Sequence, residues 1–287
     1  MSVNPADWRR MRGDPFFIRL DTGLFKPKDG ILGADIAGLV EAVGAKVTQF
    51  KPGDEVYGEL ATGGFAEYVC ATERKLALKP SNLSFAEAAA VPLAAITALQ
   101  GLRDKGKVQS GQTVLVNGAS GGVGTFAVQI AKSFGAKVTG VCSTRNVDMV
   151  RSIGADHVVD YTKEDFTQSG QIYDLILDVV GNLSAADCRR VLAPKGIFVV
   201  IGFKAMSLLF KLMFQATVAS VTGGQKVALM NATANQRDLG VLKGLIEAGE
   251  VKPVIDRRYG FDQIPEALGY VEEGHSRGKV VITVNPD

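Results

Sequence analysis

The sequence is poor in the residues that bind metals or form disulfides. It contains only three cysteines and two histidines among its 287 residues. Cys70, Cys142 and Cys188 are odd in number and widely spaced, which indicates reduced thiols rather than a disulfide framework. No two cysteines have C-x-x-C spacing, and His157 and His275 are too few to complete a catalytic or a structural zinc site. We therefore expect no bound metal.

The sequence also lacks long apolar runs and an excess of charge of one sign. No apolar run is long enough to cross a bilayer as a helix, and the N-terminus lacks the apolar core of a signal peptide. The 32 Lys and Arg residues nearly balance the 30 Asp and Glu residues without a basic cluster, so we expect no nucleic-acid partner. We expect a cytoplasmic protein, or an organellar one if a targeting segment upstream of Met1 is missing.

The most informative stretch is TVLVNGASGGVGTFAVQIAKSF, residues 113–134. Residues 113–117 form a short β-branched run typical of a buried parallel strand, and apolar residues at spacings of three and four from Val123 predict a helix. The turn between them leaves unpaired N–H groups at the helix N-terminus, where a diphosphate is the natural ligand. The candidate residues in this turn are Gly118, Ser120, Gly121, Gly122, Val123 and Gly124. A glycine turn without a ligand is the alternative, but the strand expected next, at 137–142, favours a dinucleotide site.

The end of that next strand predicts which dinucleotide is bound. A site for NAD would have Asp or Glu about 20 residues after the glycines, to bind the ribose 2′-hydroxyl. Here the chain reads Cys142-Ser-Thr-Arg-Asn, and the first acid is Asp148. Ser143 and Thr144 can donate hydrogen bonds to a 2′-phosphate, and Arg145 can supply positive charge. The pattern favours NADPH over NADH, with a solvated Arg145 at the next helix start as the alternative.

The rest of the chain predicts two domains, which 287 residues are enough to form. Residues 1–80 combine strand-like runs with Gly, Pro and Asp turns, as in a small β-barrel. The strand-like runs are residues 31–44, 55–57 and 64–71. Residues 84–102 predict a helical connector in which Ser84 and Glu87 form a capping box and Pro92 breaks or kinks the helix.

From residue 113 onwards strands and helices alternate, which predicts a doubly wound parallel sheet. The expected strands are 113–117, 137–142, 157–160, 174–180 and 197–202, and the expected helices are 123–134, 146–153 and 183–192. Residues 236–284 predict a helix, a strand, a helix and a strand. We expect the last of these to return to the first domain, because they do not continue the alternation.

Six motifs occur along the chain in an order that resembles one known family. They are GGFAEYV, PLAAITAL, GASGGVG, GADHVVDY, GEVKPVIDRRY and GHSRGKVVI. Together they are similar to zinc-free, quinone-oxidoreductase-type members of the medium-chain dehydrogenase/reductase superfamily. The resemblance implies an α/β fold, with a doubly wound parallel Rossmann sheet and a GroES-like β-barrel.

The resemblance also implies a division of the chain into domains. Residues 1–90 would form the first part of the substrate domain, 91–235 the dinucleotide-binding domain, and 236–287 a C-terminal return to the substrate domain. In this family the segment matching residues 2–7 follows several barrel strands, so we expect a truncated barrel. Zinc-dependent relatives carry a G-H-E segment, and the matching stretch, Gly33-Ala34-Asp35, lacks the histidine.

The resemblance implies that the protein transfers a hydride from NADPH to an acceptor that needs no Lewis acid. A quinone, or a C=C bond conjugated to a carbonyl, suits this role because its own oxygen can take up the developing charge. The short-chain reductase mechanism is excluded, because none of the six tyrosines has a lysine four residues on. We expect a small lipophilic acceptor as the partner molecule.

The family's site residues can be carried over by position. The resemblance implies that Ser120, Gly122 and Val123 contact the diphosphate, Ser143 and Tyr161 the 2′-phosphate, and His275, Ser276 and Arg277 the outer side of the nucleotide. It also implies that Asn4, Asp7, Phe65, Thr97 and Phe203 lie near the nicotinamide. Asn4 is the candidate for a hydrogen bond to the acceptor oxygen. The alternatives are a turn residue for Asn4, a plain strand end for Tyr161, and a solvated loop for His275 and Arg277.

The role of residues 204–219, the oligomeric state and the function each allow the following interpretations. The apolar stripe in residues 204–219 predicts an apolar lid or a peripheral membrane contact, or else a core or dimer-interface helix. The family suggests a homodimer through residues 220–232. For the function, the alternatives to a quinone or enone reductase are an NADPH-binding sensor or scaffold without turnover, and a 2-enoyl thioester reductase.

Overall fold

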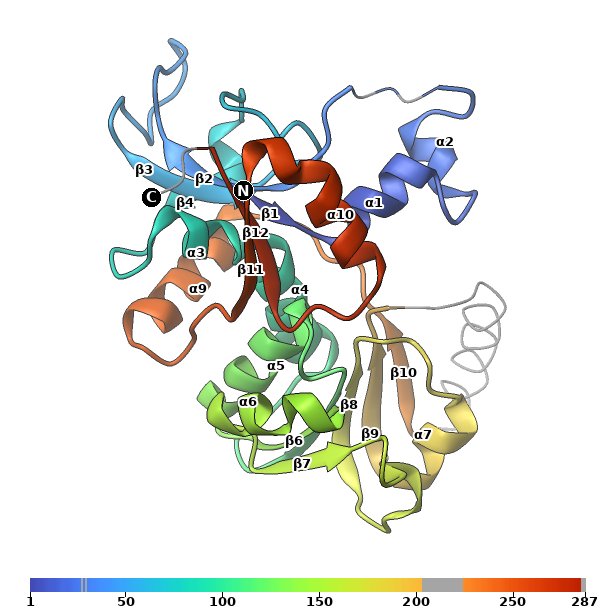
Figure 1. The fold of residues 1–287 in the computed structure, drawn as a ribbon. Helices are drawn as coiled ribbons and strands as arrows, with labels where there is room; N and C mark the ends of the chain where they lie inside the picture. Colours follow the sequence, from blue (N-terminus) through green and yellow to red (C-terminus); the bar gives the residue numbers. More distant parts are fainter. Residues whose placement is uncertain (27, 29, 203–223, 285–287) are drawn as a thin grey trace. The chain divides into compact units, whose positions relative to one another are not determined.

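The computed structural model describes residues 1–26, 28, 30–202 and 224–284. The chain forms two compact units (Figure 1). Unit 1 comprises Met1–Ile96, Thr233–Gly249 and Pro253–Asp287, and unit 2 comprises Thr97–Ala232 and Glu250–Lys252. The domain boundaries expected from the sequence stay a prediction. No helix among the described residues is long and apolar enough to span a membrane.

Unit 1 is built on a sheet in the order β11-β12-β1-β2-β3-β4. Its strands are β1 (Ser2–Val3), β2 (Asp35–Leu39), β3 (Glu55–Glu59), β4 (Leu76–Leu78), β11 (Ile255–Gly260) and β12 (Lys279–Thr283). The pair β11 and β12 is parallel and the other pairs are antiparallel. The C-terminal strands thus join a sheet begun by the first residues of the chain.

The helices of unit 1 are α1 (Pro5–Arg12), α2 (Ile18–Thr22), α3 (Phe85–Ala89), α9 (Gln236–Glu247) and α10 (Ile264–Glu272), with the 3-10 turns η1 (Glu73–Lys75) and η5 (Phe261–Gln263). Three of these helices, α3, α9 and α10, pack on the strands of this sheet, and α1 packs on α10. Helix α10 packs on β1, β12 and α1, around a core that includes Val3, Phe65 and Val280. The connector expected at 84–102 is confirmed as α3 followed by α4 (Pro92–Gln100), and Pro92 begins the second helix. Ser84 and Glu87 form the expected capping box, with the Glu87 N–H donating to Ser84 Oγ at 3.3 Å.

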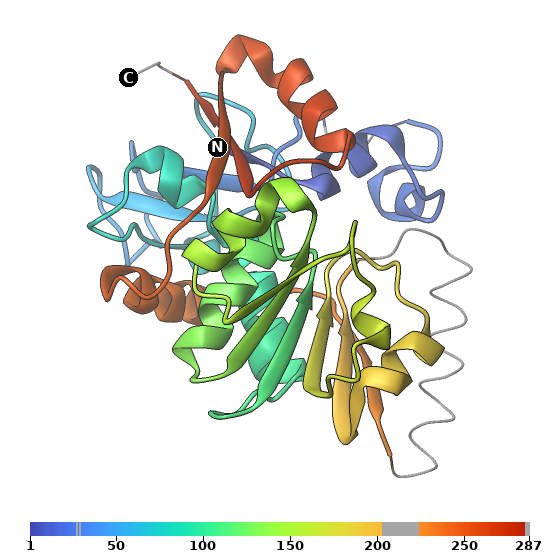
Figure 2. The same cartoon turned by 60° about the horizontal axis from the view of Figure 1, so that its bottom comes forward.

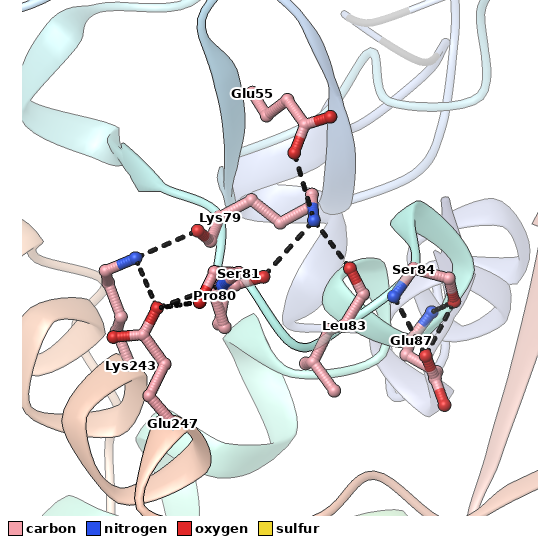
Figure 3. A network of polar contacts seen from close by, with 9 residues as sticks. All are labelled: Glu55, Lys79, Pro80, Ser81, Leu83, Ser84, Glu87, Lys243 and Glu247. Carbon is pink, nitrogen blue, oxygen red and sulfur yellow. Dashed lines mark hydrogen bonds and ion pairs between the residues drawn. The ribbon is translucent and has the colours of Figure 1, made fainter.

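A buried lysine joins two distant parts of unit 1 (Figure 3). The Lys79 ammonium lies 3.1 Å from a Glu55 carboxylate oxygen and donates to the Leu83 carbonyl at 2.5 Å. Lys243, on α9, donates to the Lys79 carbonyl and to Glu247, both at 2.9 Å. Burying an ammonium is costly unless its protons are bound, and Lys79 binds its own within the segment that leads into α3 and to Glu55. The Lys243 bond to the Lys79 carbonyl then links α9 to this segment.

Unit 2 is a six-stranded parallel sheet in the order β10-β9-β8-β5-β6-β7. The strands are β5 (Thr113–Asn117), β6 (Lys137–Cys142), β7 (His157–Asp160), β8 (Tyr173–Asp178), β9 (Leu192–Val200) and β10 (Lys226–Leu229). They lie side by side in both views of the molecule (Figures 1 and 2). The remaining elements are η2 (Gly101–Lys105), α5 (Gly122–Ser133), η3 (Thr144–Asn146), α6 (Val147–Ser152), η4 (Phe166–Gln168) and α7 (Ala185–Val191).

The chain order of this sheet reverses between β5 and β8, so the expected doubly wound fold is confirmed. In such sheets ligands bind at the carboxyl ends of the strands, beside the reversal point. Residues 114–116 of β5 and 175–177 of β8 are completely buried, which explains the continuous apolar runs in the sequence. Helix α5 packs on β5 and β6, and the turn before it lies at the reversal point.

One expected strand is wrong. Residues 64–71 form no strand: the N–H groups of Gly64 and Phe65 donate to the carbonyls of Gly33 and Leu32, both at 2.8 Å, and the chain then bends. The Phe65 side chain enters the core while residues 67–70 are exposed, so the strand-like run contains one anchored aromatic ring rather than a paired strand. The lid or interface helix expected at 204–219 lies outside the described residues.

Candidate nucleotide-binding and active site

The glycine turn of unit 2 connects β5 to α5. Gly121 is the N-cap of α5, with φ −83° and ψ 176°. The first helical hydrogen bond runs from the Thr125 N–H to the Gly121 carbonyl at 2.9 Å. The N–H groups of residues 122–124 precede that bond, so they have no acceptor within the helix. This is the arrangement of donors and helix dipole that binds a phosphate.

The glycines of this turn serve two different purposes. Gly118 has φ +86°, a left-handed conformation that favours glycine, and a Cβ on Gly124 would lie 2.0 Å from the Gly118 carbonyl oxygen. The fold itself therefore requires these two. Gly121 has an ordinary φ, and a Cβ there would meet no protein atom closer than 3.6 Å. The fold itself therefore does not require glycine at position 121, whereas close approach of a dinucleotide diphosphate would.

A residue missed by the sequence analysis, Asn146, joins the glycine turn to the end of β6. Its Nδ2 group donates to Ser120 Oγ at 3.1 Å and to Ser143 Oγ at 3.2 Å. Asn146 is 5% exposed, and its Oδ1 is buried without a hydrogen-bond partner among the described residues. Two serines expected to contact different phosphates are thus brought together by one amide. The sequence signal was a polar residue at the start of the helix after β6, which on its own looks like an ordinary helix cap.

A carboxylate at the end of β7 orders the neighbouring loop. The Asp160 carboxylate accepts from Thr144 Oγ1 at 2.6 Å and from Thr162 Oγ1 at 2.7 Å, and Lys163 lies 3.4 Å away. The Thr144 bond is the largest of several hydrogen bonds that lower the pKa of Asp160 to about 2. The single hydroxyl proton of Thr144 is therefore engaged in the protein's own network, while Arg145 beside it is exposed.

A second carboxylate supports the turn from the other side of β5. Asp178, at the end of β8, accepts from Asn117 Nδ2 at 2.8 Å and from the N–H groups of Val180 at 3.1 Å and Gly181 at 2.9 Å. Burial raises the pKa of Asp178, and its Oδ2 has no partner among the described residues. The carboxyl ends of β5 and β8 are thereby tied together at the reversal point.

Unit 1 contains a buried polar row that crosses three strands. Ser2 on β1 lies opposite Asp35 on β2, and Asp35 lies opposite Glu59 on β3. Directly opposed residues of antiparallel strands project on the same face. Ser2 Oγ donates to Asp35 Oδ2 at 2.8 Å, and the Leu93 N–H donates to Asp35 Oδ1 at 2.9 Å. Asp35 has no exposed surface.

Asn4, the candidate catalytic residue, is part of this row. Its Nδ2 donates to Asp35 Oδ2 at 2.8 Å, and its Oδ1 accepts from the ammonium of Lys279. Lys279 also lies 3.4 Å from Asp35 Oδ2. Asn4 is 2% exposed. Because the lysine binds the amide oxygen and the carboxylate binds the amide nitrogen, the orientation of the Asn4 side chain is fixed. Sequence reasoning missed Asp35 and Lys279 as partners because they lie far from Asn4 along the chain.

The other expected site residues are distributed over both units. In unit 2, Thr97 is buried in α4 and Tyr161 is exposed after β7. In unit 1, His275 and Arg277 are exposed and Ser276 is half-buried, and the Arg277 N–H donates to Asp256 at 2.8 Å. Phe203 lies outside the described residues. The roles of these residues in binding stay predictions.

Two family models match this chain. They are the alcohol dehydrogenase GroES-like domain, over residues 1–81, and the zinc-binding dehydrogenase, over residues 153–282. Among the described residues, no group of three or more His, Cys, Asp or Glu side chains could hold a metal ion. The described side chains therefore do not fit the zinc that the second model's name implies.

Known proteins resemble the chain over nearly its whole length. The 2-methylene-furan-3-one reductase of Solanum lycopersicum is 38% identical, over 98% of this chain and 69% of the relative. The chloroplastic NADPH-dependent alkenal/one oxidoreductase of Arabidopsis thaliana is 35% identical, over 98% of this chain and 69% of its own. The structure of the quinone oxidoreductase from Coxiella burnetii superposes with a TM-score of 0.85 at 29% identity, covering 99% of this chain and 88% of that one. The chain therefore belongs to the medium-chain dehydrogenase/reductase superfamily of oxidoreductases, in the group of the quinone oxidoreductases and alkenal reductases.

Proposed function

We propose that this protein uses NADPH to reduce quinones or α,β-unsaturated carbonyl compounds. The observation that carries the proposal is the turn at the reversal point of the sheet. Its N–H groups at residues 122–124 have no acceptor within the helix, and Asn146 joins its Ser120 to Ser143 after β6. Such a turn suits a diphosphate, and the relatives named above include an NADPH-dependent alkenal/one oxidoreductase and a quinone oxidoreductase.

The preference for NADPH rests on the residues that follow β6. Ser143 is a hydroxyl donor and Arg145 a cation, and both groups favour a 2′-phosphate over a 2′-hydroxyl. The carboxylate bonded to this segment, Asp160, comes from the next strand and already accepts from two threonine hydroxyls, with Lys163 close by. We infer that Thr144 positions the loop through Asp160 and leaves contact with the phosphate to Ser143, Arg145 and Tyr161.

The chemistry of the acceptor follows from the polar row of unit 1. The nicotinamide, when bound, supplies the hydride. Asn4 carries two hydrogens on Nδ2, and the bond to Asp35 uses one of them. We propose that the second hydrogen bonds the acceptor oxygen, where negative charge develops as the hydride is added. Lys279 and Asp35 prevent the amide from turning over and presenting its oxygen instead.

The test is NADPH oxidation, followed at 340 nm, with 1,4-naphthoquinone, 1-octen-3-one and crotonyl-CoA. We expect turnover of the quinone or the enone. Turnover of crotonyl-CoA alone would favour a 2-enoyl thioester reductase. Tight NADPH binding without turnover of any acceptor would contradict the proposal and favour a sensor or scaffold.

A further inference from the structure

The polar row of unit 1 ends in a carboxyl group that its hydrogen-bond network does not use. Glu59 is the last residue of β3 and lies directly opposite Asp35. Asp35 binds Ser2, Asn4 and Lys279. By contrast, Glu59 Oε2 is buried without a hydrogen-bond partner among the described residues. Buried polar atoms are rarely left without a partner, so an unpartnered carboxyl oxygen beside the candidate catalytic residue needs an explanation.

The surroundings of Glu59 favour its neutral, protonated form. Burial is the main cause that raises the pKa of Glu59 to about 7, and the negative charge of Asp35 adds to it. Lys75 on η1, Lys279 on β12 and Arg10 on α1 act in the opposite direction. Near neutral pH a substantial fraction of the protein therefore carries a proton on Glu59.

The other two carboxyl groups of this region already have structural tasks. Asp35 accepts from Ser2, Asn4 and Lys279 on one oxygen and from the Leu93 N–H on the other. Asp7 accepts from the Asn4 N–H at 2.7 Å and so caps the start of α1. Glu59 is also more accessible than these two, because its side chain is half-buried and theirs are buried. Of the three carboxyl groups, Glu59 therefore has the most exposed side chain, and its Oε2 has no hydrogen-bond partner among the described residues.

We propose that Glu59 is the general acid that protonates the reduced α,β-unsaturated carbonyl compound. This inference rests on the proposed function. The hydride from NADPH adds to the β-carbon, and the C=C electron pair moves to give an enolate whose oxygen is held by Asn4. The enolate then takes the carboxyl proton of Glu59 on its α-carbon, which leaves a saturated ketone and a Glu59 carboxylate. Water returns the proton to the carboxylate, so one NADPH and one proton are consumed for each double bond reduced.

A quinone places a different demand on the site. Hydride addition to a quinone ends with the charge on an oxygen atom, which solvent can protonate, whereas the enolate needs a proton on carbon. Replacing the acid should therefore impair enone reduction much more than quinone reduction. This difference separates a catalytic acid from a residue that merely supports the fold or binds NADPH, because such a residue would affect both acceptors alike.

The variant Glu59→Gln keeps the size of the side chain and removes the acidic proton. We expect its kcat with 1-octen-3-one to fall about 100-fold or more, with the rate for 1,4-naphthoquinone nearly unchanged. The matched control is Glu67→Gln, at an exposed glutamate of the same unit, which should reduce both acceptors like the wild type. An equal loss with both acceptors, or an undiminished enone rate, would overturn the assignment of Glu59. If the wild type reduces neither acceptor, it is the proposed function that fails.

The pH dependence provides a second test of the same group. Catalysis by an acid requires the protonated form, so the wild-type enone rate should fall as the pH rises through about 7. Glu59→Gln should lose this decline. Burial also raises the pKa of Asp7 to about 7. Asp7 is still present in the Glu59→Gln variant, so a decline caused by Asp7 would remain there. A decline that persists in Glu59→Gln would therefore assign the proton to another group and overturn the proposal.

Thermal unfolding tests the protonation of Glu59 without any substrate. The pKa of Glu59 in the folded protein lies above its ordinary value of 4.5. The stability that the bound proton of Glu59 gives to the folded state is therefore complete below pH 4.5 and is lost as the pH rises through about 7. The melting temperature of the wild type should fall relative to that of Glu59→Gln over this interval. Parallel curves for the two proteins would show that the folded state does not hold this proton, and would contradict the inference.

Discussion

At the scale of single residues, two polar side chains hold in place the residues that we expect to bind the nucleotide. Asn146 connects Ser120 with Ser143, and Asp160 binds Thr144 and Thr162. Neither needs to touch the nucleotide to matter, since a misplaced hydroxyl loses most of its hydrogen-bond energy to a phosphate.

Asp160 should stabilise the fold in a way that depends on pH. Its folded pKa of about 2 lies below the ordinary value of 3.8, so the stabilisation is complete above pH 4 and is lost as the pH falls towards 2. We expect Asp160→Asn to melt below the wild type at pH 7, with the gap closing between pH 4 and pH 2. Thermal unfolding monitored by circular dichroism checks this. A gap that stays constant down to pH 2 would contradict the role of the carboxylate.

The 2′-phosphate assignment makes a prediction about two arginines. The double variant Arg145→Ala, Arg277→Ala should weaken NADPH binding much more than NADH binding, because only NADPH carries the extra phosphate. A loss of about 10-fold or more in affinity for NADPH corresponds to the removal of one charged hydrogen bond. Fluorescence titrations with both nucleotides measure it. Equal losses for the two would refute the assignment.

The sequence predicted the residues whose place follows from neighbouring elements, but not the partners that lie far away along the chain. Ser120 and Ser143 follow strands that alternate with helices, so their place at the carboxyl edge follows from topology alone. The partners of Asn4 could not be predicted, because Asp35 and Lys279 come close only through the pairing of β1 with β2 and β12. The row from Ser2 to Glu59 depends on a strand register that no local pattern specifies.

At the scale of elements, capping residues and apolar runs predicted the starts of helices and the ranges of strands correctly. Ser84, Glu87 and Pro92 act within a few residues, and α3 and α4 begin where they predict. The strands β5, β6 and β7 also matched the expected ranges. The error at 64–71 arose because the apolar and aromatic residues of this run look like a strand, whereas Phe65 alone is anchored in the core and residues 67–70 are exposed.

The capping box of α3 is open to a direct test. Ser84→Ala removes the acceptor of the Glu87 N–H, and we expect it to lower the free energy of unfolding by about 1 kcal/mol. Ser84→Thr keeps a hydroxyl at the same place and should restore most of the loss. Urea unfolding of the three proteins measures both effects. A Ser84→Ala variant as stable as the wild type would show that the cap contributes nothing.

At the scale of the whole molecule, the chain builds two units and returns to the first with its last strands. Both ends of the chain share one sheet, since β12 pairs with β1. The Lys79 network adds a second link between early and late parts of the chain in unit 1, through α9. The alternation of strands and helices in the sequence predicted the parallel sheet of unit 2, because each of these elements is a continuous stretch with its own sequence pattern.

The activity that we propose for this protein is the transfer of a hydride from NADPH to a conjugated acceptor. The most direct measurement uses NADPH deuterated at the transferred position of the nicotinamide, with 1-octen-3-one as acceptor and mass spectrometry of the product. We expect octan-3-one with one deuterium at the β-carbon and a solvent proton at the α-carbon. NADPH binding without transfer of label to the enone, and without reduction of 1,4-naphthoquinone, would contradict it.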